Sequence, residues 1–273
     1  MSLRAHEKTF FLLSLQPVKA SINIRGHLHD LSAPQVMGIL NVTPDSFYAH
    51  SRVAGEEAVR ARIRQIRDEG ASMIDVGACS TRPGSQPVSE GEEMERLSCS
   101  LPLVRREWPE AVVSVDTFRP SVAAAVLERG WADIVNDVRG GSDAMTDVLS
   151  RFRAPYVLTQ PDFRRMGEAL ERLRERGVAD VILDPGFGFS GGVESDYRLF
   201  ATLPALVSEL RCPVLVGVSR KSMITKTLGI TSEEALPGTV CLNTVALLKG
   251  ASILRVHDVR EAVQCVTLCS KLA

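Results

Sequence analysis

Short apolar runs that end at polar residues recur along this chain. The first run covers residues 36–40, lacks helical spacing and stops at Asn41, which predicts a buried strand with polar side chains at its carboxyl end. Seven later runs repeat the pattern, at residues 73–77, 112–116, 134–137, 156–160, 181–184, 214–218 and 253–257. Amphipathic stretches separate these runs. One of them is residues 56–69, where Val59, Ile63 and Ile66 share one helical face.

The way in which the strands are entered repeats as well. Four strands follow a glycine that ends the preceding helix, and three of the others follow a proline. The glycines are Gly70, Gly130, Gly177 and Gly250, and the prolines are Pro34, Pro155 and Pro213. Eight strand–helix units with apolar strands require a parallel sheet that is covered by helices. We therefore expect an α/β fold, a single-domain (β/α)8 TIM barrel, rather than an open doubly wound sheet.

Some element boundaries carry signals of their own. Ser89 and Glu92 form a capping box that opens a helix, and Pro120 marks the first turn of another. Residues 21–31 alternate apolar and polar positions around Gly26, which predicts a β-hairpin that plugs or flanks the domain. We divide the chain into an N-terminal extension with this hairpin, residues 1–33, and a barrel domain, residues 34–273.

Composition narrows the class of protein. The 273 residues suit one barrel domain of ~250 residues, and the net charge of -1 argues against a nucleic-acid or membrane-surface partner. No apolar run reaches the ~20 residues that span a bilayer, and the N-terminus lacks a signal-peptide pattern. We therefore expect a soluble cytoplasmic protein. The six cysteines show neither C-x-x-C pairs nor zinc spacing, so we expect them to be buried free thiols.

Polar residues at the strand ends supply the candidate chemistry, because active sites of such barrels lie at the carboxyl ends of the strands. One set can pair with a flat heterocycle that bears donors and acceptors: Asp116, Asn136 and Asp184. A second, cationic set suits a phosphate or diphosphate group: Arg82, Lys221, Arg255 and His257. Asn41 offers a neutral oxygen to Mg2+, for which the phosphates of a substrate would be the main ligands.

Each candidate also has a purely structural interpretation. Asp116 precedes a helix start and fits an N-cap, Lys221 fits a solvated loop lysine, and Asn41 fits a bond to local turn backbone. Arg255 and His257 alternate, so their side chains share one strand face. If that face is the barrel interior, an unpaired arginine there is very costly, which favours a functional role for Arg255.

Residues 186–191, Gly-Phe-Gly-Phe-Ser-Gly, match the G-x-G-x-x-G pattern of dinucleotide sites. That interpretation requires the first βαβ unit and an acidic residue at the end of the next strand. Here the pattern lies in the sixth unit, and the next strand ends at Val218, Ser219 and Arg220. We instead expect the glycines to let a loop lie close to a flat ligand.

Taken together, the strand ends resemble those of the dihydropteroate synthase family, from about residue 34 to the C-terminus. The matching segments are Val36-Met-Gly-Ile-Leu-Asn-Val-Thr-Pro-Asp-Ser-Phe47, Ile74-Asp-Val-Gly77, Ser80-Thr-Arg-Pro-Gly84, Ser114-Val-Asp-Thr117, Ile134-Val-Asn-Asp137, Leu183-Asp-Pro-Gly-Phe-Gly-Phe189, Val216-Gly-Val-Ser-Arg-Lys-Ser222 and Ile253-Leu-Arg-Val-His-Asp258. The resemblance implies a (β/α)8 barrel, a homodimer, Mg2+ as cofactor and a target of the sulfonamide class. It also implies a reaction that joins 7,8-dihydropterin-6-ylmethyl diphosphate to p-aminobenzoate and releases diphosphate.

The resemblance implies a role for each candidate. The pterin would be held by Asp116, Asn136, Asp184 and Lys221. The diphosphate would be held by Arg82, Arg255 and His257, with Mg2+ bound at Asn41. The p-aminobenzoate pocket would be bordered by Thr81, Pro83, Phe189, Ser219 and Lys221. The catalytic set is then Asp116, Lys221, Arg82, Arg255 and His257.

The chain departs from the family pattern at four places. Residues 47–52 lack the usual Ser-Asp-Gly-Gly of the first loop, and Cys79 stands where Glu is usual. Residues 159–160, Thr-Gln, replace the usual Met-His, and residues 190–191, Ser-Gly, replace the usual Gly-Lys. None of these changes removes an assigned residue, but they bear on loop dynamics and on the lining of the pterin pocket.

Two rival functions share parts of this pattern. A pterin-dependent methyltransferase has the same barrel and pterin-facing residues but no diphosphate to hold, so Lys221, Arg255 and His257 argue against it. A catalytically silent pterin-binding paralogue would lose loop residues, yet Asn41 and the Thr81–Arg82 pair are present. We therefore predict the transferase activity of the dihydropteroate synthase family.

Overall fold

Eight parallel strands close into a barrel in a computed structural model that describes residues 21–42, 52–79 and 88–272. The strands are β3 (Gln35–Asn41), β4 (Met73–Gly77), β5 (Val112–Asp116), β6 (Ile134–Asp137), β7 (Tyr156–Thr159), β8 (Val181–Asp184), β9 (Leu215–Val216) and β10 (Ile253–Val256). Their order is β8-β7-β6-β5-β4-β3-β10-β9. A parallel bridge from Leu183 to Val214 joins the two ends of this order. The predicted (β/α)8 barrel is therefore confirmed, and the open sheet is excluded.

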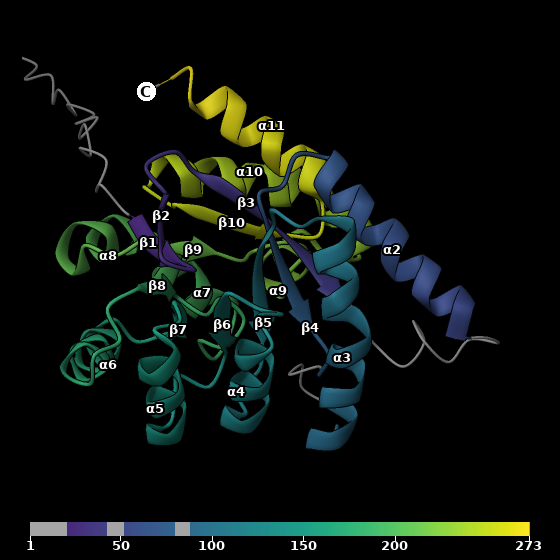
Figure 1. The fold of residues 1–273 in the computed structure, drawn as a ribbon. Coiled ribbons are helices and arrows are strands. Elements are labelled where there is room, and N and C mark those ends of the chain that lie inside the picture. Colours follow the sequence, from purple (N-terminus) through teal and green to yellow (C-terminus); the bar gives the residue numbers. More distant parts are fainter. Residues whose placement is uncertain (1–20, 43–51, 80–87, 273) are drawn as a thin grey trace, which may run out of the picture.

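Helices surround the barrel strands (Figure 1). In chain order they are α2 (Arg52–Asp68), α3 (Glu90–Glu107), α4 (Pro120–Glu128), α5 (Asp143–Phe152), α6 (Phe163–Glu175), α7 (Val193–Ala201), α8 (Leu203–Leu210), α9 (Ser222–Leu228), the 3-10 turn η1 (Glu233–Ala235), α10 (Leu236–Leu248) and α11 (Val259–Cys269). The predicted capping box is present: Ser89 Oγ accepts from the Glu92 amide, and the Glu92 carboxylate accepts from the Ser89 amide. Pro120 opens α4 in its first turn, as predicted.

The four strand-entry glycines all have left-handed backbone, which explains the repeat in the sequence. Their φ angles are 95° at Gly70, 65° at Gly130, 85° at Gly177 and 93° at Gly250. A residue without a Cβ adopts this conformation without steric cost, so it ends one helix and turns the chain into the next strand.

The interior of the barrel begins with an apolar layer to which each strand contributes one side chain. The members are Met37, Met73, Val112, Ile134, Val157, Ile182, Leu215 and Ile253. The N-terminal hairpin, β1 (Ser21–Ile24) and β2 (His27–Asp30), packs Ile22 and Ile24 against this layer, together with the following Leu31. The hairpin therefore plugs the amino-terminal end of the barrel, the first of the two predicted arrangements.

Ion pairs hold the hairpin in place. Arg25 at its turn binds the buried Asp133 carboxylate through Nε and Nη2, and Arg105 of α3 pairs with the same carboxylate at 2.9 Å. The amide of Asn23 donates to Asp180 Oδ1 at 3.1 Å. Asp133 and Asp180 precede β6 and β8, so these contacts tie the plug to the rim opposite the strand carboxyl ends.

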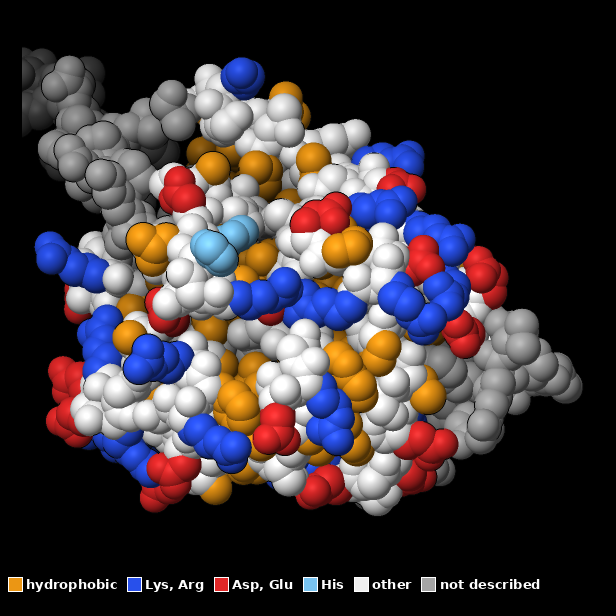
Figure 2. Space-filling view, viewed as in Figure 1, with side chains coloured by type: hydrophobic (Ala, Val, Ile, Leu, Met, Phe, Trp, Pro, Cys, Tyr) orange, Lys and Arg blue, Asp and Glu red, His pale blue; other side chains and the backbone are white. Residues whose placement is uncertain are grey.

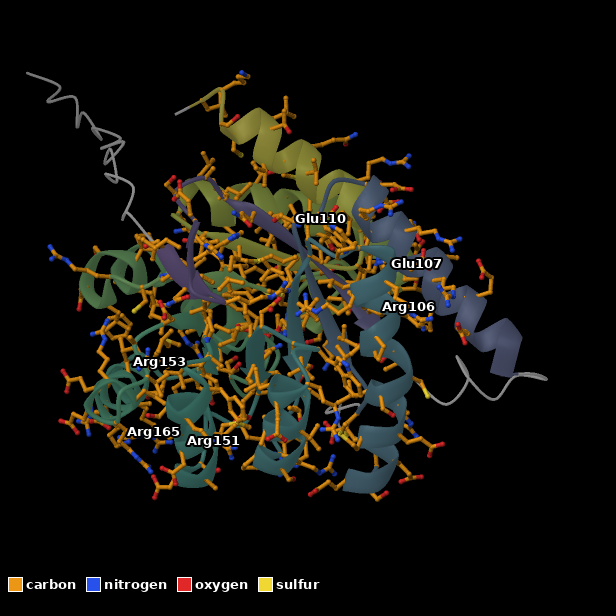
Figure 3. All side chains as sticks on the ribbon, in the orientation of Figure 1. Arg106, Glu107, Glu110, Arg151, Arg153 and Arg165 are labelled. Carbon is orange, nitrogen blue, oxygen red and sulfur yellow. The ribbon has the colours of Figure 1, made fainter. Side chains whose placement is uncertain are left out.

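Charged side chains also tie the outer helices to one another. Arg64 Nε of α2 lies 2.8 Å from Glu107 Oε2 of α3, and Arg60 pairs with the same carboxylate. Figure 3 labels Glu107 beside α2, toward which its side chain points. Basic and acidic side chains are interspersed on the face shown in Figure 2, in keeping with the net charge of -1.

The cysteines depart partly from expectation. All six are free, as predicted, and Cys212 and Cys265 are buried. Cys99 and Cys241 are exposed on the outer sides of α3 and α10, so the prediction of burial is wrong for them. Within the described parts of the chain, no helix combines the length and apolarity needed to cross a membrane.

Candidate active site at the carboxyl ends of the strands

A polar layer lies directly above the apolar layer of the barrel. Asp75, Asn136, Asp184 and Arg255 each follow a member of the apolar layer by two positions. Because strand side chains alternate between faces, these four point into the barrel on the side of the carboxyl ends. The same strands therefore carry both the apolar layer and the polar layer above it.

Arg255 is the centre of this layer, and only 11% of its side chain is exposed. Its Nη1 lies 3.2 Å from Asp75 Oδ2, and its Nη2 lies 3.4 Å from Asp184 Oδ2. Asn136 Nδ2 donates to the same Asp75 oxygen at 3.0 Å. Burial acts to lower the pKa of Arg255, but the charges of Asp184, Asp75 and Asp116 outweigh it and raise that pKa. The predicted inward-facing arginine is thus present with its charge compensated.

Asp116 ends β5 at the upper edge of this layer. Removal from water raises the pKa of its carboxyl to about 7, the charge of Asp75 adds to the rise, and Arg255 opposes it. The N-cap interpretation is wrong, because the cap of α4 is Arg119. Among the described residues no hydrogen bond reaches the Asp116 carboxyl, so it is available to a ligand.

Asp184 and Lys221 meet around the glycine-rich loop after β8. Asp184 Oδ1 accepts from the Gly186 amide at 2.8 Å. Lys221 Nζ donates to the carbonyl oxygen of Phe187 and lies 5.7 Å from the ring centroid of Phe189. Lys221 is therefore not a solvated loop lysine. The loop brings it close to a half-exposed aromatic ring, which is consistent with the expected approach to a flat ligand.

Ser219 and His257 come together at the ends of β9 and β10. The amide of His257 donates to Ser219 Oγ at 3.2 Å. The carbonyl oxygen of His257 accepts from Arg62 Nη2 of α2 at 2.7 Å. Arg220 has a different task, because it forms a two-bond ion pair with Asp258, at 2.9 and 2.8 Å. That pair braces the loop after β9 against the start of α11.

Asn41 ends β3 beside a cavity of about 440 Å3. The cavity is lined by Ile39, Leu40, Asn41, Ala58, Val59, Arg62, Arg220, His257 and Asp258. The described residues form no cluster of three or more His, Cys, Asp or Glu side chains suited to a metal. Asn41 can give a cation one neutral oxygen, and this donor set fits an ion such as Mg2+ only if substrate phosphates and water supply the other ligands.

Thr81, Arg82 and Pro83 lie outside the described residues, so their predicted roles stay predictions. The described residues on either side of them are fixed. Arg96 Nη1 of α3 donates to the Ala78 carbonyl oxygen at 2.9 Å. Arg119 Nη2 donates to the Val88 carbonyl oxygen, while its Nη1 pairs with the buried Glu93.

A sequence profile for the family described as pterin binding enzyme matches residues 37–257 of this chain. Dihydropteroate synthase of Escherichia coli (strain K12) is 37% identical over 260 residues, which cover 86% of this chain and 90% of that protein. The chain belongs to the dihydropteroate synthase family. The folate synthesis bifunctional protein of Arabidopsis thaliana is 34% identical over 93% of this chain, which spans 60% of that longer protein.

Solved structures of family members share the fold. Dihydropteroate synthase of Xanthomonas albilineans with 4-aminobenzoic acid superposes with a TM-score of 0.83 at 33% identity, over 93% of this chain and 98% of that one. The Yersinia pestis enzyme with a sulfonamide drug gives 0.82 at 32% identity, over 92% and 98%. This chain is therefore a transferase of folate synthesis, built on the same barrel as these enzymes.

Against this family background, the structure adds Asp75 to the residues found from the sequence. Asp75 is 3% exposed, and it connects Asn136 to Arg255. The signal was an acidic residue inside the apolar run of residues 73–77, in register with the inward positions. Asp75 Oδ1 and Asn136 Oδ1 have no hydrogen-bond partner among the described residues, so the layer keeps unused acceptors.

Proposed function

We propose that the chain joins 7,8-dihydropterin-6-ylmethyl diphosphate to p-aminobenzoate and releases diphosphate. The observation that carries this proposal is the enclosed layer of Asp75, Asn136, Asp184 and Arg255, because such a set of acceptors and donors suits the polar edges of a pterin. The names of the family relatives and of their ligand complexes support it. The reaction breaks the bond from the methylene carbon to the diphosphate oxygen and forms a carbon–nitrogen bond, and the amine proton leaves to solvent.

The pterin is held by Asp116, Asn136, Asp184 and Lys221 in this proposal. Carboxylates accept from the ring N–H and amino groups, and an amide both donates and accepts. Hydrogen bonds to charged groups are about twice as strong as neutral ones, so they fix the orientation of a flat ligand. The positive charge that develops on the methylene carbon as diphosphate departs is stabilised by the nearby Asp116 carboxylate.

The diphosphate is held by Arg82, Arg255 and His257 in this proposal, and Mg2+ would bind there with Asn41. When bound, the ion would neutralise charge on the diphosphate and make it a better leaving group. The chain's own residues orient the diphosphate away from the incoming amine. Arg255 is suited to hold the diphosphate beside the pterin, since it lies at the centre of the polar layer. Gly217 leaves room for it, because an added Cβ there would come within 3.3 Å of Arg255 Nε.

The p-aminobenzoate pocket is bordered by Phe189, Ser219 and Lys221, with Thr81 and Pro83 on the other side. An aromatic ring and a lysine suit a benzoate, since one packs on its ring and the other attracts its carboxylate. Holding the weakly nucleophilic amine in line with the leaving group then contributes much of the rate.

The proposal extends to assembly and location. A homodimer is expected from family resemblance, and the outer helix α10 leaves the large apolar side chain of Leu248 56% exposed. A cytoplasmic location fits a pathway of small soluble substrates.

A diphosphate-release assay with a sulfonamide tests the proposal. Release should require both substrates, and a sulfonamide should raise the KM for p-aminobenzoate without changing kcat, because the two compete for one pocket. Release that continues without p-aminobenzoate, or inhibition that p-aminobenzoate does not relieve, would contradict the assignment.

A further inference from the structure

Arg62 of α2 is a half-buried cation without an ion-pair partner among the described residues. Its Nη2 donates to the His257 carbonyl oxygen at 2.7 Å, and its Nη1 donates to Gln65 Oε1 at 3.0 Å. Both partners are neutral. Burial lowers the pKa of its guanidinium, and the more distant charges of Glu69 and Asp258 only partly offset this.

Other arginines of the same helix are arranged differently. Arg60 pairs with Glu56 and Glu107, and Arg64 pairs with Glu57 and Glu107. A cation that is partly removed from water loses hydration energy, and a carboxylate partner normally restores it. Arg62 lacks that partner, although three of its five N–H groups form no hydrogen bond to a described residue.

The charges around the cavity beside Arg62 favour an anion. Asn41 and His257, the residues assigned to the metal and the diphosphate, line the same cavity as Arg62. Among the described residues that line it, the only carboxylate is Asp258, and the two-bond pair with Arg220 neutralises it. The unbalanced charge of the described lining is therefore the guanidinium of Arg62.

We propose that Arg62 is a further diphosphate-binding residue, which contacts the diphosphate group of the substrate and of the released product. Its remaining N–H groups donate to phosphate oxygens, while its bond to the His257 carbonyl holds the end of β10 against α2. This inference rests on the proposed function, because it takes the diphosphate to bind between Asn41 and His257.

Calorimetric titration of inorganic diphosphate with Mg2+ into the full-length protein tests the inference. Arg62→Gln should weaken diphosphate binding by roughly tenfold or more, because a charge-assisted bond to phosphate is lost. It should also make the affinity less dependent on salt, and it should leave the affinity for a bare pterin unchanged. The matched control is Arg64→Gln on the same helix, which removes an arginine already paired with carboxylates and should leave diphosphate binding as in the wild type.

The outcomes separate the inference from the proposed function. Arg62→Lys should retain part of the diphosphate affinity, since it keeps the charge but loses the planar fork. If Arg62→Gln binds diphosphate like the wild type, or weakens pterin and diphosphate binding equally, the inference is overturned while the proposed reaction stands. If the wild type neither binds diphosphate nor turns over, the proposed function fails and the inference fails with it.

Discussion

Replacing Asp184 with asparagine tests the pterin-binding layer with almost no change in volume. Asp184 is 2% exposed, and its two oxygens have separate tasks. Oδ1 accepts from the Gly186 amide at 2.8 Å, which an amide oxygen can continue to do. Oδ2 faces Arg255 at 3.4 Å. Asp184→Asn removes the negative charge there, and the orientation that keeps the bond from Gly186 turns an N–H donor toward the Arg255 donor.

The expected losses of pterin affinity and of folding stability follow from the partners of Asp184. A buried hydrogen bond to a charged group contributes roughly 1.5–3 kcal/mol, so pterin affinity should fall by about 10- to 150-fold. Stability should fall by less than the roughly 3–5 kcal/mol typical of leaving a buried ion without its partner, because Arg255 keeps Asp75 at 3.2 Å.

Calorimetry with a bare pterin measures the change in affinity. Urea unfolding of the same samples measures the change in the free energy of unfolding. Asp133→Asn is the matched control, since Asp133 is an equally buried carboxylate that pairs with Arg25 and Arg105 at the opposite end of the barrel. It should lower stability and leave pterin affinity unchanged. A folded Asp184→Asn protein that binds pterin within twofold of the wild type would refute the assignment.

Three further predictions concern pH, metal and loop coupling. Burial raises the pKa of the Asp116 carboxyl from 3.8 to about 7, so between these pH values the folded state binds a proton that the unfolded state has lost, and the free energy of unfolding falls as pH rises. Asp116→Asn should flatten this fall in urea unfolding, and an unchanged pH profile would argue against the raised pKa. EDTA should abolish turnover and Mg2+ should restore it, and full activity in EDTA would contradict the role of the metal. Asn41→Ala should weaken binding of the pterin diphosphate more than binding of a bare pterin. Titrated p-aminobenzoate should bind measurably only after diphosphate with Mg2+ is present, and Arg82→Ala should lose this coupling; equal affinity in both states would show a preformed pocket.

The barrel could be predicted from the sequence because its signals are local. Each apolar run predicts a strand, and each entry glycine, such as Gly70, predicts the end of a helix, from a few neighbouring residues alone. The exception is the strand predicted at residues 214–218, of which Leu215–Val216 form β9 and Val214 forms a single bridge to Leu183. Gly217 follows β9 directly and lies beside Arg255 of the neighbouring β10, where an added Cβ would come within 3.3 Å of Arg255 Nε. No local sequence pattern encodes this constraint.

The candidate site was predictable where strand order alone brings residues together. Asp116, Asn136 and Asp184 end consecutive or nearby parallel strands, so they meet without further information. Asp75 and Arg62 were missed because their partners lie 180 and 195 residues away, at Arg255 and His257. Such pairings depend on how the barrel closes in three dimensions. The sequence pattern predicts that a barrel forms, but it does not predict which distant residues the barrel brings together.

Direct identification of the products tests whether the chain catalyses the condensation of the pterin diphosphate with p-aminobenzoate. The purified full-length protein is incubated with the pterin diphosphate, Mg2+ and p-aminobenzoate, and mass spectrometry and a diphosphate assay follow the products. We expect one dihydropteroate and one diphosphate for each p-aminobenzoate consumed, and neither product when p-aminobenzoate is omitted. Pterin binding without any product, as in a silent paralogue, or transfer of a methyl group from a methylated pterin, would contradict this expectation.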